Sequence, residues 1–323
     1  MPEKNNSGSS VRSISVILPI YNEASTIIDV IENVIKVLVT QDLDFEVITV
    51  DDGSNDATLE KLRLLRKTFP KYVRVVQHLI NRGNGAALRS GTRIAKGSII
   101  VYMDADGQHT PDEIQKLIEF IPPYDLVVGS RTNEYQSSWF RRVANNFYNR
   151  FASWLSRTEV QDLTSGFRAM RREAVVHFLP LFPNGFSAPT TTTLAFLKAG
   201  YNVAFLPIHV GKRAAGKSKI NLWRDGGQFL LIILRMVMLF DPLRIFFPAG
   251  VILSILGFIA GVAGILNAHR LVLSNSAILF FLAAILTWLL GLIASQIASS
   301  LIYYHGDETI IVDGSPYEPS SSG

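Results

Sequence analysis

Two long apolar segments near the C-terminus constrain this chain more than any other feature of its sequence. Residues 246–266 and 278–301 are almost wholly apolar, and Arg270, in the turn between them, is the one formal charge in residues 245–304. A helix needs about 20 apolar residues to cross a bilayer, and a buried helix of a soluble core usually keeps a polar face. The pattern therefore predicts a hairpin of two transmembrane helices within residues 244–304.

Basic side chains on the N-terminal side of this hairpin indicate its orientation. Because Lys and Arg are retained on the cytoplasmic side of membranes, we expect residues 1–244 and the tail at 305–323 in the cytoplasm, at a prokaryotic cell membrane. The polar tail at 1–12 predicts no cleavable signal peptide. The basic residues are Lys212, Arg213, Lys217, Lys219, Arg224, Arg235 and Arg244.

The segment 222–243 links the preceding part of the chain to the hairpin. Its apolar run, 229–240, contains Arg235 and is too short to span a bilayer. It predicts an amphipathic helix lying in the membrane interface.

Composition excludes several classes of protein. Hydrophobic residues make up 48% of the chain and charged residues 18%, with a net charge of +4, which excludes a disordered protein. The chain has no cysteine, which excludes a disulfide scaffold, a Cys-ligated metal site and a thiol nucleophile.

Predicted strands and helices alternate through residues 13–221. Short apolar runs predict strands, and apolar residues at helical spacing predict helices between them. Such alternation is typical of an α/β fold with a mostly parallel sheet covered by helices on both faces. The strands are expected at 14–19, 45–50, 73–77 and 98–103, and the helices at 23–39, 58–68 and 86–95.

Polar residues follow three of these strands, and ligands of such sheets bind at the carboxyl ends of strands. The carboxylates of Asp104 and Asp106 and the amide of Gln108 offer the oxygen ligands that suit Mg²⁺ or Mn²⁺. A turn that caps the next helix, near Asp112, is the alternative explanation. His109 is expected beside this site rather than as a ligand.

The strand ends at 21–23 and 51–52 predict a nucleotide site. Tyr21 can stack on a base, and Asp52 can accept a base N–H, although Asp51 and Asp52 also suit a helix cap. Glu23 is also explained by its place at a helix N-terminus. Basic residues in loops or at element ends are candidates for contact with an anionic substrate: Arg82, Arg131, Arg141, Arg142, Arg168, Arg213, Lys217 and Lys219.

Two glycine-rich segments imitate other nucleotide-binding motifs. Residues 83–88 (GNGAAL) resemble a dinucleotide fingerprint, but Leu88 stands where the third glycine belongs. Residues 211–218 (GKRAAGKS) match the Walker A pattern, but few residues follow before the hairpin. We interpret 211–218 as a flexible loop that contacts phosphate. A membrane-anchored P-loop NTPase and a non-catalytic nucleotide-binding scaffold remain alternatives.

The order of motifs resembles family 2 glycosyltransferases of the GT-A fold. Together with the hairpin, the later motifs are similar to the branch that makes polyprenyl-phosphate sugars, including dolichyl-phosphate mannose synthase. The Gln-x-x-Arg-Trp motif of processive synthases is absent from the sequence. The motifs are 19–23 (PIYNE), 50–54 (VDDGS), 81–85 (NRGNG), 104–109 (DADGQH), 129–131 (GSR), 162–168 (DLTSGFR) and 216–219 (GKSK).

The resemblance implies roles for individual residues. It implies a nucleotide-sugar site at Pro19, Tyr21, Glu23, Val50, Asp52, Arg82, Asp104, Ala105 and Asp106. It implies a metal site at Asp104, Asp106 and Gln108. The catalytic residues that it implies are Asp104, Asp106, Arg131, Arg141, Arg142, Arg213 and Lys219, with Arg141 or Arg142 meeting the lipid phosphate.

The implied reaction is transfer of a hexose, with inversion, from GDP-mannose or a UDP-hexose to a polyprenyl or dolichyl phosphate. The lipid phosphate is anionic near neutral pH, since its second pKa is about 6, so it requires no general base. A lipid or glycan hydroxyl is the alternative acceptor, and it would need a base, for which Asp162 is the candidate. No nucleic-acid partner is expected, and a homo-oligomer stays open.

Overall fold

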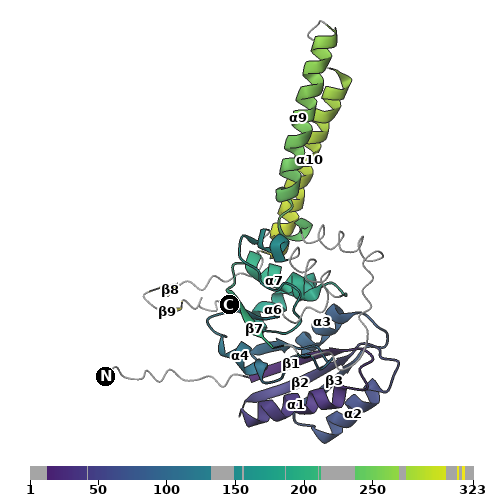
Figure 1. The fold of residues 1–323 in the computed structure, drawn as a ribbon, viewed down its shortest axis with the longest axis vertical. Helices are drawn as coiled ribbons and strands as arrows, with labels where there is room; N and C mark the ends of the chain where they lie inside the picture. The colour runs from purple at the N-terminus through teal and green to yellow at the C-terminus, as the bar shows by residue number, and fades with distance from the viewer. Residues whose placement is uncertain are drawn as a thin grey trace, which may run out of the picture. The chain divides into compact units, whose positions relative to one another are not determined.

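The computed structural model describes two compact units, residues 1–220 and 221–323 (Figure 1). Most of the expected interfacial helix at 222–243 lies outside the described residues. The structure describes residues 13–41, 43–131, 149–154, 156–185, 187–209, 211, 237–268, 274–302, 311–312 and 315–316.

The first unit is built on a seven-stranded sheet with the order β3-β2-β1-β4-β6-β5-β7. Strand β6 is antiparallel to both of its neighbours, β4 and β5, and the other paired strands are parallel. The expected α/β fold with a mostly parallel sheet is therefore confirmed. The strands are β1 (Ser13–Ile20), β2 (Asp44–Asp51), β3 (Val73–Gln77), β4 (Ile99–Tyr102), β5 (Leu126–Arg131), β6 (Arg168–Arg171) and β7 (Val203–Ile208).

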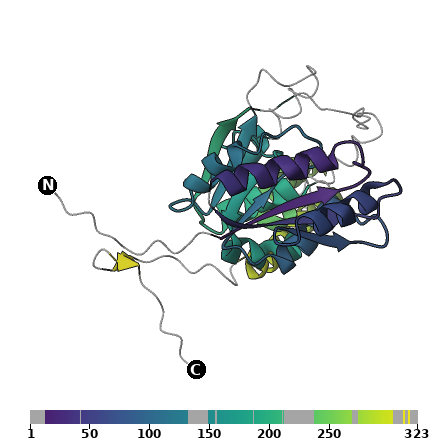
Figure 2. The same ribbon diagram turned by 90° about the horizontal axis from the view of Figure 1, so that it is seen from below.

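Helices cover both faces of the sheet. In Figure 1, α1 and α2 lie on one side of the strands, and α3, α6 and α7 lie on the other. The view from below shows the purple helix α1 running across the strands (Figure 2). The helices are α1 (Ile27–Thr40), α2 (Thr58–Thr68), α3 (Asn84–Ile94), α4 (Glu113–Glu119), α6 (Arg172–Phe178) and α7 (Ala188–Lys198), with a short 3-10 helix η2 (Leu179–Leu181).

Helix α1 shows how the sequence pattern builds this packing. Its buried residues recur three and four positions apart, so they form one stripe that packs on the sheet. The helix begins at Ile27, not at Glu23 as predicted, because the carbonyl of Glu23 accepts bonds from the amides of Thr26 and Ile27 in a preceding turn. The buried stripe is Ile27, Val30, Ile31, Val34, Ile35 and Leu38.

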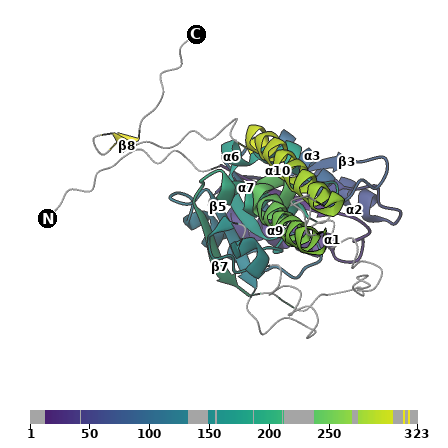
Figure 3. The same cartoon turned by 90° about the horizontal axis from the view of Figure 1, so that it is seen from above.

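The second unit contains the two predicted apolar helices. Helices α9 (Leu243–Ala268) and α10 (Asn275–Ile302) are long and apolar enough to span a membrane, with mean hydropathies of 2.4 and 2.6 over the candidate spans. They lie side by side when viewed from above (Figure 3). A methyl group at Gly250 would lie 2.1 Å from the indole nitrogen of Trp288, so this glycine allows close packing. A short antiparallel pair, β8 (Ile311–Val312) and β9 (Ser315–Pro316), completes the described residues.

Candidate active site

The predicted polar clusters lie at one edge of the sheet. Because β1, β2, β3 and β4 are mutually parallel, their carboxyl ends lie together. Strand β5 runs the same way as β4, since β6 is antiparallel to both. Tyr21, Asp52, Asp104 and Arg131 therefore occupy a common edge, which is where α/β sheets bind ligands.

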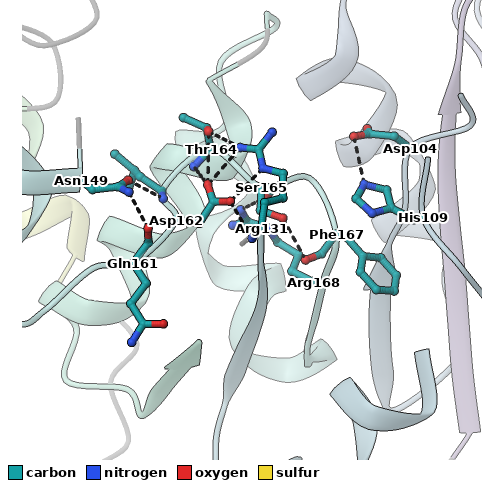
Figure 4. A network of polar contacts seen from close by, with 11 residues as sticks. Asp104, His109, Arg131, Asn149, Gln161, Asp162, Thr164, Ser165, Phe167 and Arg168 are labelled. Atoms are coloured by element: carbon teal, nitrogen blue, oxygen red, sulfur yellow. Dashed lines mark hydrogen bonds and ion pairs between the residues drawn. The ribbon is translucent and has the colours of Figure 1, made fainter. Parts of the chain in front are cut away.

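Asp104 follows β4 and is held in a close-fitting position. The backbone of Gly166 lies against its carboxylate, and a methyl group at residue 166 would lie 2.6 Å from Oδ2. On another side, Nε2 of His109 lies 3.8 Å from Oδ2, and the His109 ring stacks on Phe167 (Figure 4). Burial raises the pKa of Asp104, but His109 and the charges of Arg131 and Arg168 outweigh this effect and lower it. The carboxylate is therefore ionised at neutral pH.

The turn after Asp104 presents further oxygen atoms. Oδ1 of Asp106 accepts a bond from the amide of Gln108 at 3.1 Å, and Gly107 between them has a φ of +74°. Two carboxylates and one amide oxygen in a single turn fit a Mg²⁺ or Mn²⁺ ion that also binds substrate phosphates. Among the described residues, no three His, Asp or Glu side chains form a preformed metal cage.

The segment after β7 starts beside this turn. The amide of Gly211 donates to the carbonyl of Gln108 at 2.8 Å. Gly211 is the first residue of the Walker-like segment 211–218. The strand that precedes this segment, β7, is the edge strand of the sheet next to β5. Of the predicted site residues, Arg141, Arg142, Arg213 and Lys219 lie outside the described residues.

Asp52 organises the loop that follows β3. Its carboxylate is 3% exposed and accepts bonds from the amides of Arg82 and Gly83, at 2.9 and 2.7 Å. Nδ1 of His78 lies 2.6 Å from Oδ1 of Asp52, and Nε2 of His78 lies 2.9 Å from the hydroxyl of Ser90. Sequence reasoning missed His78, because a single histidine after a strand carries no signal until the fold brings it to Asp52.

The end of β1 offers an aromatic surface. Tyr21 is 42% exposed, and the backbone beside it is fixed, since the amide of Asn22 donates to the hydroxyl of Ser54 at 3.0 Å. Pro19 and Val50 pair in register between β1 and β2, directly before this edge. The amide of Glu23 donates to the hydroxyl of Thr58, and Ala105 is buried next to Asp104. These last contacts fix the positions of the two turns.

Arg131 is tied to a neighbouring carboxylate. Nε and Nη2 of Arg131 donate to the two carboxylate oxygens of Asp162, at 2.8 and 3.0 Å, and Nη2 also donates to the hydroxyl of Thr164 (Figure 4). Burial raises the pKa of Asp162, but Arg131 outweighs burial and lowers it. Because both of its oxygens already accept bonds and its lowered pKa makes it a weaker base, Asp162 is poorly suited to take a proton from a hydroxyl acceptor.

Arg168 does not face the edge as an exposed cation. It is fully buried, and it donates to the carbonyls of Pro189 and Ser165 and to the hydroxyl of Thr193. Burial lowers its pKa to about 10. Arg168 therefore joins β6 to α7, and a substrate phosphate cannot reach it without rearrangement. Arg82, by contrast, is exposed.

The glycines of the apparent dinucleotide fingerprint have a packing role. A methyl group at Gly85 would lie 1.9 Å from the carbonyl oxygen of Pro183, and one at Gly83 would lie 2.2 Å from that of Asn184. The amide of Gly85 also donates to the carbonyl of Asn184 at 3.0 Å. The start of α3 is therefore pressed against residues 183–185 of the same unit.

Comparisons with known proteins agree with this architecture. The family model described as Glycosyl transferase family 2 matches residues 15–178, and one described as GtrB C-terminal hairpin matches residues 241–300. A crystal structure of glucosyl-3-phosphoglycerate synthase from Mycobacterium tuberculosis, in complex with Mn²⁺ and UDP-glucose, is similar in fold. Its TM-score is 0.53 with 24% identity, over 69% of this chain and 78% of that one.

Sequence relatives extend the likeness to most of the chain. An undecaprenyl-phosphate 4-deoxy-4-formamido-L-arabinose transferase from Edwardsiella ictaluri is 29% identical over 77% of this chain and 75% of its own length. The protein of the same description from Proteus mirabilis is 27% identical over 78% of this chain and 76% of its own length.

Proposed function

The chain belongs to glycosyl transferase family 2 and is a glycosyltransferase of the GT-A fold, and we propose that it transfers a hexose from a nucleoside diphosphate to a polyprenyl phosphate. GDP-mannose and UDP-hexoses are the candidate donors. The match of residues 241–300 to a hairpin family and the descriptions of the relatives as undecaprenyl-phosphate transferases support this acceptor.

The observation that carries the proposal is the oxygen-rich turn at the end of β4. Asp104 is held between Gly166 and His109, and Asp106 and Gln108 follow in the same turn. These side chains would hold Mg²⁺ or Mn²⁺, which supplies positive charge to the departing nucleoside diphosphate. The carboxylate of Asp104 is ionised before any metal binds, because its pKa is lowered.

We propose that the donor nucleotide lies along the ends of β1 and β2. The exposed ring of Tyr21 is available to stack on the base, next to the paired residues Pro19 and Val50. Asp52 acts on this site through the backbone: it fixes the amides of Arg82 and Gly83, and so it sets the position of the Arg82 side chain. Glu23 and Ala105 shape the two turns that flank the nucleotide.

The acceptor chemistry needs charge compensation and no proton removal. A phosphate monoester is anionic near neutral pH, so its oxygen can attack the anomeric carbon directly. A single displacement of this kind inverts the anomeric configuration. We propose that basic side chains offset the negative charge of the donor diphosphate and of the acceptor phosphate. These are Arg131, Arg141 or Arg142, Arg213 and Lys219. The pairing of Arg131 with Asp162 favours this acceptor over a hydroxyl group.

Membrane attachment follows from the same acceptor. A polyprenyl chain stays in the bilayer, so its phosphate is presented at the height of the lipid headgroups. Two helices long enough to span a membrane would keep the catalytic unit at that surface. We propose that this unit faces the cytoplasm, where positive flanking residues are retained, and that residues 222–243 lie in the interface.

Transfer by the purified full-length protein tests the proposal. The protein would receive polyprenyl phosphate, Mn²⁺ and, in separate reactions, labelled UDP-glucose, UDP-N-acetylglucosamine, UDP-galactose or GDP-mannose. We expect label from one donor to enter the lipid phase, and Asp106→Ala to abolish this transfer. Asp44→Ala, a change of an exposed carboxylate on β2, is the matched control and should keep activity. Absence of transfer from every donor would contradict the proposed acceptor.

A further inference from the structure

The loop after β3 presents two large apolar side chains to solvent. Leu79 is 89% exposed, the highest value among the large apolar residues that the structure describes. Ile80 is 66% exposed, the same value as Phe258 in the candidate membrane helix α9. Exposed apolar residues are common singly, but these two are adjacent in the chain and together form a small apolar surface.

The loop holds these side chains outward by a rigid backbone. A methyl group at Gly53 would lie 2.6 Å from the carbonyl carbon of Ile80 and 2.7 Å from the amide nitrogen of Asn81. Two residues later, Asp52 binds the amides of Arg82 and Gly83. The exposure of Leu79 and Ile80 is therefore built into the fold, although burial in an apolar environment would be favourable for both.

The position of the loop favours the lipid headgroup region as this apolar environment. Strand β3 is parallel to β2 and belongs to the same sheet as β1 and β4, so the loop lies at the edge that carries Asp104 and Asp106. The exposed Arg82 follows the two apolar residues. Apolar and basic side chains together are the combination by which amphipathic helices bind the headgroup region of anionic membranes, and this loop presents the same combination.

We propose that Leu79 and Ile80 insert into the lipid headgroup region, so that this edge of the sheet rests on the bilayer. The inference rests on the proposed lipid-phosphate acceptor, since the phosphate must reach Asp104 and Asp106 without leaving headgroup height. Amphipathic helices that lie in this region bury their apolar faces about 5–10 Å into it, and we propose a similar shallow insertion for the two loop side chains. The loop is then a second contact with the membrane, separate in sequence from α9 and α10.

Site-specific fluorescence tests the contact directly, because the natural chain has no cysteine. Leu79→Cys in the full-length protein would carry an environment-sensitive fluorophore, in nanodiscs of anionic phospholipid with or without a nitroxide-labelled lipid. Leu64→Cys on α2, where the native side chain is 57% exposed, is the matched control. We expect a blue shift and loss of most emission with nitroxide lipid at position 79, and neither at position 64.

Other outcomes would overturn the inference. Equal quenching of both labels by aqueous iodide, with none by nitroxide lipid, would place the loop in water. A change in the emission at position 79 that appears only when UDP or GDP is added would show that the loop responds to nucleotide binding and not to the membrane. A change that depends on the number of protein copies in each disc would assign it to a second copy of the chain.

A kinetic measurement separates this inference from the proposed function. In the double variant Leu79→Asn, Ile80→Asn, the KM for long polyprenyl phosphate in vesicles should rise roughly tenfold or more, because lost burial of one such side chain weakens association by about that factor. The affinity for nucleotide should not change. Transfer by the natural protein without nitroxide quenching would overturn the inference alone, and quenching without transfer would overturn the proposed acceptor alone.

Discussion

The guanidinium of Arg131 and the carboxylate of Asp162 form a two-pronged ion pair across 31 residues of sequence, with Nε and Nη2 bonded to separate oxygens. This pair fixes the end of β5 to the segment that precedes β6. It also weakens Asp162, the base that the sequence suggests for a hydroxyl acceptor. The same contact therefore shapes both the fold of the edge and the chemistry that the edge can perform.

Asp162→Asn should lower the free energy of unfolding by more than the loss of a surface ion pair would. The change leaves Arg131 without its charged partner in a mostly buried place, and we expect a loss of about 2 kcal/mol in the free energy of unfolding. Thermal unfolding of the detergent-solubilised protein measures this. Asp44→Asn, at an exposed position of β2, serves as the control, and equal melting temperatures for the two variants would contradict the role of the pair.

Glu46 should contribute stability that depends on pH. Burial raises its pKa, but bonds from Arg74, Ser15 and the amide of Lys96 outweigh burial and lower it below the ordinary value. A carboxyl whose pKa is lower in the folded state stabilises fully above its unfolded pKa, near 4.3, and loses this contribution as pH falls through the lower folded value.

We therefore expect Glu46→Gln to reduce the melting temperature at pH 7, and the difference from the natural protein to shrink as pH falls through the folded pKa of Glu46. The comparison is made by melting both proteins across this range in one detergent. A difference that stayed constant with pH would show that packing, and not the charge of Glu46, accounts for the effect.

Gly166→Ala should impair metal-dependent activity. The new methyl group would lie 2.6 Å from Oδ2 of Asp104 and would displace that carboxylate. Changes that misplace a metal ligand typically cost about 10–100-fold in metal affinity or activity. The concentration of Mn²⁺ that gives half-maximal transfer should rise accordingly. Gly185→Ala is the control, because a methyl group there meets no atom of the described residues within 4 Å, and equal metal dependence of the two variants would contradict this assignment.

Gly85→Ala should lower the free energy of unfolding, with or without bound nucleotide. Its methyl group would lie 1.9 Å from the carbonyl oxygen of Pro183, and relieving this overlap should cost about 2–3 kcal/mol. Melting temperature checks the expectation. A dinucleotide site would give the opposite pattern, with normal melting and a lost response to NAD.

Much of the fold follows from patterns that are local in the sequence. The buried stripe of α1 and the apolar runs of β1 and β2 have the periods that helices and buried strands require. The two apolar helices follow from length alone. Strand β6 could not be predicted, because its sequence, RAMR, is not an apolar run, although Arg168 within it is fully buried. Its antiparallel direction depends on its pairing with β4 and β5, which no local pattern indicates.

The residues of the candidate site likewise divide into those that local sequence identifies and those that only the fold brings together. Asp104, Asp106 and Gln108 could be found from the sequence because they lie in one turn after one strand. His78, Gly166 and the partner of Arg131 could not, because each gains its role from a contact between segments far apart in the chain. The roles of the predicted nucleotide and phosphate residues stay predictions until the variants above are measured.

The mass of the lipid product tests the central claim most directly. After incubation of the full-length protein with polyprenyl phosphate, Mn²⁺ and the donor that supports transfer, the account predicts a lipid heavier by one hexose residue that keeps a single phosphate. It also predicts release of an equal amount of nucleoside diphosphate, and loss of both products in Asp106→Ala. A lipid heavier by a hexose phosphate, a glycosylated hydroxyl acceptor, or nucleotide hydrolysis without lipid product would contradict the account.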